Sequence, residues 1–313
     1  MDILINITFP IFAIIAVGYL AGHWKILGQE SGVALNRFVY LFALPSALFV
    51  FTARAQVADI LNWPFIGTFV LGTVLTLLIA LGVGWFLFRH RGATLTLHGL
   101  SAVFPNVTFI GLPLFLTTFG EARVMPPIIA TLCSILLLVG GTITALEFQR
   151  NREVLLGQAL AEVAATLIRN PLLVAVASGF VFSVLSVPVP KPFEIFFNLM
   201  AATAAPAALF ALGLALVDQP ILAEFKEVCW LVVLKLVAQP VITYWLAVYV
   251  FPVDPFWAKS AVILAALPGA STAFVLAQEH NVYVRRSSAS IVLSTVISVL
   301  TLSVLLALLD VRG

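Results

Sequence analysis

The chain has 313 residues, of which 62% are hydrophobic and only 10% are charged, and its formal net charge is +2. Soluble domains carry about 25% charged residues, so this composition cannot cover a surface exposed to water. It excludes a soluble domain and indicates an integral membrane protein in contact with the lipid bilayer, while the small, dispersed charge argues against a nucleic-acid partner.

The first predicted element covers residues 3–22, "ITFPIFAIIAVGYLAG" being its apolar part. An acidic residue, Asp2, precedes it, and no small-residue cleavage site follows it. A secretory signal peptide would have a basic start and such a site. We therefore expect a retained membrane span.

Further apolar segments follow along the whole chain. A helix needs about 20 apolar residues to cross the hydrocarbon layer. The predicted spans are ten in number: residues 3–22, 32–51, 65–89, 94–119, 123–147, 171–187, 193–217, 228–251, 256–280 and 286–309. The sequence thus predicts an all-α integral membrane protein. Residues 148–170 have apolar positions at helical spacing with charges between them, which predicts an amphipathic linker helix on the cytoplasmic surface.

The orientation follows from the lysines and arginines of the connections. Ten spans place both termini on the same side of the membrane. If that side is outside, roughly twice as many basic residues lie in the inner connections as in the outer ones, as the positive-inside rule requires. We predict a multi-pass protein of the inner or plasma membrane with both termini outside.

The two halves of the chain, residues 1–147 and 171–313, resemble each other at an offset of 161 to 163 residues. The matched pairs include Pro10 with Pro171, Gly18 with Gly179, Pro45 with Pro206, Phe49 with Phe210, and Pro105 with Pro268. Each half has an odd number of spans, so the halves enter the membrane in opposite directions. The sequence predicts two inverted five-helix repeats.

The fourth and ninth spans are interrupted at corresponding places, by Pro105 in "FPNVTFIGLPLF" and by Pro268 in "LPGAS". Proline removes a backbone donor and clashes with the preceding turn. Broken backbone at this depth is tolerated where it is buried in protein or lines a cavity. Secondary transporters often place their binding site at such paired interruptions, where helix N-termini favour an anion.

Five motifs in this order resemble the auxin efflux carrier family, in a microbial branch of malonate and other organic-acid transporters. They are "LNRFVYLFALPSALF" (35–49), "FPNVTFIGLPLF" (104–115), "AAPAALFALGLAL" (204–216), "VVLKLVAQPV" (232–241) and "ALPGASTAFVLAQEHNV" (266–282). The family has a glycine-asparagine pair where this chain has Pro105 and Asn106, so the asparagine is kept and its neighbour differs.

The resemblance implies a ten-helix fold shared with bile-acid/sodium symporters. Spans 1, 2, 6 and 7 would form a scaffold, and spans 3–5 and 8–10 a transport domain with two broken, crossing helices. It also implies a homodimer with an elevator-like movement. The bile-acid relatives bind sodium through acidic and polar ligands. No matching acidic residue lies within the cores of the predicted spans, so the resemblance does not support sodium coupling.

Asn106 is the leading candidate ligand, because its amide can donate to a carboxylate at the interruption. The alternative is that it caps the helix that follows, and both roles can coexist. Thr108, Ser271 and Thr272 flank the same place, although hydroxyls in membrane helices often bond their own backbone. Pro105 and Pro268 complete the predicted substrate site at this place.

Lys235 is a basic residue well inside a predicted span, one turn before Gln239. A charge at this depth is costly and indicates function, so Lys235 could attract an anion or replace a coupling cation. A structural lysine bonded to helix-end carbonyls is the alternative. Gln239 could partner Lys235 or bind substrate. We expect His98 to be a satisfied or cavity-facing histidine rather than a proton relay.

These features predict a secondary carrier that moves a small organic anion, such as a carboxylate, by alternating access. A sodium- or proton-coupled symporter of the bile-acid type, a channel and a membrane enzyme are the alternatives. The sequence shows no paired carboxylates, nucleophile-base arrangement or metal-ligand spacing, so we expect no catalytic residue, no metal and no cofactor. Cys133 and Cys229 lie inside apolar segments and predict packing residues rather than a disulfide.

Overall fold

The computed structural model describes residues 7–150, 161, 164–217, 219 and 224–310. Nearly all of them are helical, and no strand occurs among these residues. The elements of the first half are α1 (Phe9–His23), α2 (Gln29–Phe38), η2 (Val39–Ala43), α3 (Leu44–Arg54), α4 (Val57–Ile60), α5 (Trp63–Phe86), α6 (Gly92–Val103), η3 (Val107–Gly111), α7 (Leu112–Phe119), η4 (Glu121–Arg123), α8 (Met125–Ser134), η5 (Ile135–Val139) and α9 (Gly140–Arg150). Those of the second half are α11 (Pro171–Leu185), α12 (Lys191–Ala215), α13 (Phe225–Val233), η6 (Leu234–Ala238), α14 (Gln239–Tyr249), α15 (Pro255–Ala265), α16 (Ser271–Glu279) and α17 (Val284–Leu308). Most of the predicted linker helix at 148–170 lies outside the described residues.

Six helical stretches of the described chain are long and apolar enough to span a membrane. They are Glu30–Arg54, Val57–Phe86, Met125–Gln149, Lys191–Ala215, Phe225–Tyr249 and Val284–Leu308. Shorter apolar helices cover Phe9–His23, Val107–Phe119, Pro171–Leu185 and Pro255–Ala265. Each predicted span therefore coincides with one helix or with several consecutive helical segments, and the prediction of a multi-pass helical membrane protein is confirmed. That all ten ranges cross the bilayer stays a prediction.

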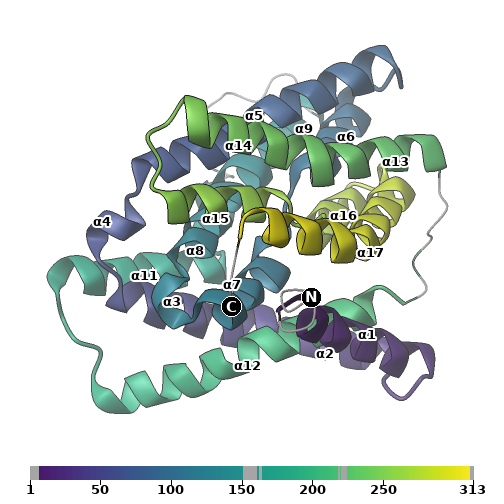
Figure 1. The fold of residues 1–313 in the computed structure, drawn as a ribbon. Helices are drawn as coiled ribbons and strands as arrows, with labels where there is room; N and C mark the ends of the chain where they lie inside the picture. Colours follow the sequence, from purple (N-terminus) through teal and green to yellow (C-terminus); the bar gives the residue numbers. More distant parts are fainter. Residues whose placement is uncertain (1–6, 151–160, 162–163, 218, 220–223, 311–313) are drawn as a thin grey trace.

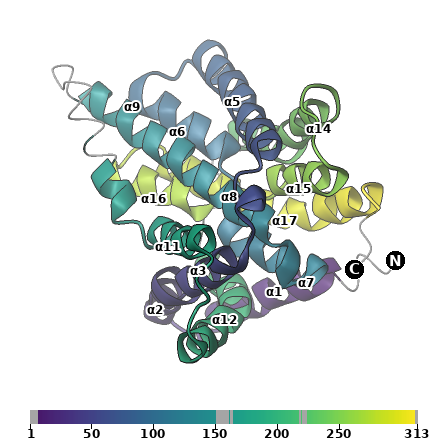
Figure 2. The ribbon, with the colours of Figure 1, turned by 90° about the vertical axis from the view of Figure 1, so that its left-hand side faces the viewer.

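The helices form two groups, which Figures 1 and 2 show from two sides. In one group α1 packs on α12, and α11 packs on α3. The other group contains α5, α6 and α13 to α17, with α5 against α6 and α14, and α13 against α17. Helix α7 contacts α12 of the first group, and helix α8 contacts both groups, through α3 of the first and through α5 and α15 of the second.

Several helices begin with a polar cap followed by proline. The side chains of Asn62, Asn170 and Asp254 accept hydrogen bonds from the first amides of α5, α11 and α15. A proline stands in the first turn of each of these helices, where its missing N–H removes no helical hydrogen bond. The sequence thus fixes these helix starts locally.

Prolines inside the apolar segments are accommodated differently. The π-helical turns η2, η3 and η6 end one residue before Leu44-Pro45, Leu112-Pro113 and Gln239-Pro240. A proline clashes with the carbonyl four residues earlier, and in each case that carbonyl belongs to the wider π turn. Such turns often occur at functional sites, and Lys235 lies in one of them. Pro206, which the repeat matches with Pro45, lies instead inside the uninterrupted helix α12.

Candidate functional site

The two interruptions lie at the predicted prolines. Helix α6 ends at Val103 and η3 begins at Val107, while α15 ends at Ala265 and α16 begins at Ser271. The short segments between them contact each other directly, because Pro105 and Gly269 form an isolated antiparallel β-bridge. The interruption of both helices is confirmed, and each supplies hydrogen-bond partners for the other.

Two backbone hydrogen bonds join the segments. The amide of Asn106 donates to the carbonyl of Pro268 at 2.9 Å, and the amide of Ala270 donates to the carbonyl of Phe104 at 3.0 Å. These bonds satisfy groups that would otherwise be orphaned in a membrane, where unpaired backbone groups are costly. The amide of Gly269 donates to Ser294 Oγ of α17 at 3.1 Å, which ties the second segment to the neighbouring helix.

Asn106 is held at the start of η3 with its side chain 2% exposed. Its Oδ1 accepts a hydrogen bond from the amide of Phe109 at 3.3 Å, so the predicted capping role is present. Its Nδ2 is buried and has no hydrogen-bond partner in the structure. A buried donor without a partner costs roughly 1–3 kcal/mol. The amide of Asn106 is therefore a donor available to a bound molecule.

The three predicted hydroxyl residues are half-buried around this place. Thr108 Oγ1 lies 3.5 Å from Thr131 Oγ1, whose own hydroxyl donates to the carbonyl of Pro127 at 2.8 Å. Ser271 and Thr272 open α16, and this helix has no side-chain cap. Its first amides therefore lack a side-chain acceptor, and the positive end of the helix dipole faces the interruption.

Lys235 is fully enclosed, with 1% exposure. Its Nζ donates to Gln239 Oε1 at 2.7 Å and to the carbonyl oxygen of Ala265 at 2.6 Å. Ala265 is the last residue of α15, so the ammonium group lies at the end of the helix where the second interruption begins. Gln239 Nε2 lies 3.4 Å from Thr73 Oγ1 of α5. Both partners of Nζ are neutral oxygens, so neither would cancel the charge of a protonated Lys235.

The structure thus brings Lys235 and Gln239 to one side of the second interruption, while Asn106 belongs to the first. The predicted structural contact of Lys235 with a helix-end carbonyl is present. Such a contact does not exclude a role in binding. Which carbonyl accepts this hydrogen bond could not be predicted, because Lys235 and Ala265 are 30 residues apart and meet only through helix packing.

A second buried polar cluster was not predicted from the sequence. His98 is completely buried, and its Nδ1 lies 2.8 Å from Glu227 Oε1. The predicted eighth span starts one residue after Glu227, yet the structure includes this residue in a membrane-length helix and buries it. Glu227 is the single buried carboxylate among the described residues. Glu227 lies in the first turn of this helix, so it is a buried acid at a span end and does not contradict the prediction that the cores of the spans hold no matching acidic residue.

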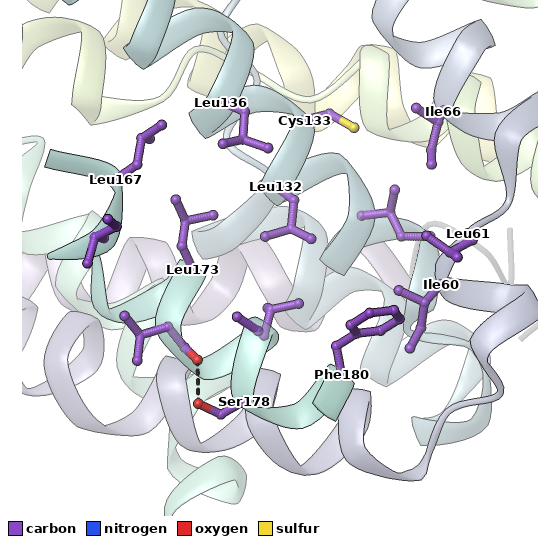
Figure 3. A pocket seen from close by; sticks show the side chains of 15 residues that line it. Ile60, Leu61, Ile66, Leu132, Cys133, Leu136, Leu167, Leu173, Ser178 and Phe180 are labelled. Atoms are coloured by element: carbon purple, nitrogen blue, oxygen red, sulfur yellow. Dashed lines mark hydrogen bonds between the residues drawn. The ribbon is translucent and has the colours of Figure 1, made fainter. Parts of the chain in front are cut away.

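A separate cavity of about 690 Å³ lies between α11 and α8 (Figure 3). Its lining is apolar and includes Leu132, Cys133, Leu173 and Phe180. The hydroxyl of Ser178, which also lines it, donates to the carbonyl of Val174 at 2.8 Å. With its polar group already paired and no charged residue in its lining, this cavity lacks the donors that an anion requires.

Comparison with known proteins gives a consistent result. A family model described as "Membrane transport protein" matches residues 3–306. The chain is 29% identical over 313 residues to a Rhizobium meliloti protein named "Putative malonate transporter", covering 97% of this chain and 95% of that protein. It is 25% identical over 302 residues to "Uncharacterized transporter YfdV" of Escherichia coli, covering 93% of each. It is 26% identical over 168 residues to "Auxin efflux carrier component 3" of Arabidopsis thaliana, covering 51% of this chain and 25% of that protein.

Proposed function

The chain belongs to the membrane transport protein family, which includes the auxin efflux carriers, and from this premise we propose that it carries a small organic anion across the membrane. The observation that carries the proposal is the unpartnered, buried Nδ2 of Asn106 at the meeting point of two interrupted helices. A carboxylate oxygen is a suitable acceptor for it. The proposal of a transporter rather than an enzyme agrees with the names of the two relatives that match more than nine-tenths of this chain, both of which are called transporters.

The charge of the surroundings favours an anion over a cation. The uncapped start of α16 presents partial positive charge, and Lys235 adds a full charge if it is protonated. Its ammonium contacts neutral oxygens. Among the described residues, the one buried carboxylate belongs to the other cluster, beside His98. A cation in the site would find no carboxylate from these residues to balance it.

A carboxylate is the substrate class that these features support best. In this proposal the donors to the carboxylate would come from Asn106, Thr108, Ser271, Thr272, Lys235 and Gln239, and Pro105 and Pro268 would shape the backbone. The name of the Rhizobium meliloti relative points to a short dicarboxylate. We therefore place dicarboxylates of about three carbons first among the compounds to be tested, before monocarboxylates and indole acids.

The proposed mechanism is alternating access with an elevator-like movement in a homodimer. Helices α1, α2, α3, α11 and α12 would form the scaffold, and α5 to α9 together with α13 to α17 would carry the substrate. The grouping seen in Figures 1 and 2 supports this division. Both termini would lie outside the inner or plasma membrane. A carrier of this kind moves substrate down its gradient unless an ion is coupled to it.

The test is uptake of labelled malonate and related acids into proteoliposomes that contain the purified protein. We expect saturable uptake that competes with other short carboxylates and persists when potassium replaces sodium. Uptake that requires sodium would support the symporter alternative, and conductance without saturation would support a channel. Absence of binding and uptake for every carboxylate tested would overturn the proposal.

A further inference from the structure

The polar cluster around Glu227 is built from four separate parts of the chain. His90 comes from the connection between α5 and α6, and His98 lies in the second turn of α6. Glu227 lies in the first turn of α13, and Tyr283 directly precedes α17. None of these residues is part of the proposed anion site, and their spacing in the sequence gives no motif.

The side chains converge on one oxygen atom. Glu227 Oε1 lies 2.7 Å from His90 Nε2 and 2.8 Å from His98 Nδ1. The hydroxyl of Tyr283 donates to the same oxygen and lies 2.9 Å from His98 Nδ1. The three ligand atoms of His90, His98 and Glu227 all lie within 4.8 Å of one another.

The burial of the cluster is graded. The side chain of His98 is 0% exposed, that of Glu227 is 5% exposed and that of His90 is 11% exposed. Among the three, His90 is the most exposed. The second oxygen of Glu227 faces Arg286, whose Nε lies 3.3 Å away, and Arg286 also pairs with Glu224. The two carboxylates and the one guanidinium group leave one net negative charge, which a bound cation could balance.

We propose that His90, His98 and Glu227 bind a divalent transition-metal ion of the zinc type. Two imidazole nitrogens and one carboxylate oxygen are a common ligand set for zinc with a fourth position left open. Tyr283 or a water molecule would stand next to that position. Zinc ligands lie about 2.0–2.2 Å from the ion. Ligand atoms around a tetrahedral ion are therefore farther apart than hydrogen-bonded atoms, and the two contacts of the imidazoles with Glu227 Oε1 would lengthen by roughly half an ångström.

Metal binding requires a change of tautomer at His98. Each imidazole presents a lone pair to the metal when its proton sits on the other ring nitrogen. His98 Nδ1 faces Glu227 Oε1, so its proton must move to Nε2, which is buried and has no hydrogen-bond partner. A buried donor without a partner is costly, and the bond to the metal must exceed this cost. The His98 ring itself is confined, because a Cβ added at Gly84 of α5 would lie 2.8 Å from its Cδ2. A bound ion would link α6, the helix that leads to the first interruption, to α13, which carries Glu227.

The alternative is a hydrogen-bond network that only satisfies a buried carboxylate. The two readings differ in one measurable property, which is affinity for a metal. We would titrate the purified chain in detergent with Co²⁺, which reports its coordination through visible absorption, and then displace it with Zn²⁺. The variants are His90→Gln and His98→Gln, and the matched control is His280→Gln, which removes an exposed histidine at the end of α16.

We expect one Co²⁺ per chain with a four-coordinate spectrum, displaced by Zn²⁺. Either cluster variant should weaken binding at least about tenfold, and the control should leave it unchanged. Zn²⁺ should raise the Tm of the wild type and of the control, but not that of His90→Gln. His90 is partly exposed, so this variant should fold even if His98→Gln does not. Equal Co²⁺ binding by wild type and His90→Gln, or no binding by the wild type, would overturn the proposal.

Discussion

Gly18 of α1 lies against the backbone of α12 so closely that a Cβ at this position would be 2.3 Å from the carbonyl oxygen of Phe210. The same contact occurs a second time with the partners exchanged. A Cβ at Gly179 of α11 would lie 2.7 Å from the carbonyl oxygen of Phe49 in α3. The sequence repeat matches Gly18 with Gly179 and Phe49 with Phe210. A reciprocal contact between matched residues is what a two-fold related pair of repeats would produce, and it supports the proposed inverted repeat.

This contact leads to the first prediction, on stability. Gly18→Ala and Gly179→Ala should each destabilise the protein by about 1–3 kcal/mol, because a methyl group must displace backbone rather than a side chain. Gly82→Ala in α5 is the control, since a Cβ there would meet nothing within 4 Å. Alanine in a helix is favoured over glycine, so the control should be neutral or stabilising. Thermal unfolding in detergent measures all three, and an unchanged Tm for both contact variants would show that the helices can separate slightly at no cost.

The second prediction concerns topology. Lys25 and Ser186 occupy equivalent positions after α1 and α11, and both have left-handed backbone conformations with φ of 58° and 52°. If the repeats are inverted, these equivalent residues lie on opposite faces of the membrane. In a background with Cys133 and Cys229 replaced by alanine, Ser186→Cys should react with an impermeant maleimide on intact cells. Lys25→Cys should react only after permeabilisation, and labelling of both from the same side would contradict the ten-span topology.

The sequence predicted the parts of the structure that depend on local chemistry. Proline disfavours a continuous helix, so both interruptions, at Pro105 and Pro268, could be placed within a few residues, although Pro206 lies inside the uninterrupted helix α12. The lengths of the apolar segments predicted where the helices lie, although the shorter helices α1 and α11 do not reach the length of a span by themselves. The π turns before Pro45, Pro113 and Pro240 were not predicted, because hydrophobic periodicity does not distinguish them from α-helix.

The missed contacts are those between distant residues. Asn106 was identified because its capping position and its polarity are both local features. The partners of Lys235 and the meeting of His90 with Glu227, which are 137 residues apart, depend on how the helices pack. A single sequence carries no direct signal for such pairs. Each of these residues looks ordinary alone, and its chemistry is defined only by its neighbours.

The third prediction separates the two roles of Asn106. Asn106→Asp retains an oxygen that can cap η3 but replaces the free donor with a second acceptor. Asn106→Ala removes both. If the donor binds substrate, both variants should lose roughly 1–3 kcal/mol of carboxylate binding, while only Ala loses the cap. Asn62→Ala is the matched control, because Asn62 caps α5 through the amide of Phe65 and lies outside the site.

Equilibrium binding and thermal unfolding are measured on the same preparations. The control should lower stability by about 1 kcal/mol and leave affinity unchanged. Affinity of Asn106→Asp equal to that of the wild type would leave Asn106 with the capping role alone.

The fourth prediction concerns Lys235, whose contacts allow both a structural and a functional role. Lys235→Met leaves Gln239 Oε1 and the Ala265 carbonyl without their donor, so it should lower stability by about 1–3 kcal/mol as well as transport. A loss of transport in this variant alone would therefore be ambiguous. Lys235→Arg keeps the charge, but a planar guanidinium cannot replace a compact ammonium in a closed space, so transport should fall here too.

The variant that resolves this ambiguity replaces the pair together. Lys235→Met with Gln239→Leu removes the side-chain donor and its side-chain acceptor at once, and apolar replacement of a buried polar pair is often neutral for stability. If Lys235 is only structural, this double variant should fold and transport like the wild type. If the charge of Lys235 or the amide of Gln239 serves the anion, the double variant should regain much of the stability that Lys235→Met lost and still fail to take up carboxylate in proteoliposomes. Lys259→Met, in the neighbouring helix α15, controls for the loss of a positive charge elsewhere and should transport normally. Wild-type uptake by the double variant would show that Lys235 only stabilises the end of α15 through its hydrogen bond to Ala265. The helix N-termini and Asn106 would then be the features that select an anion.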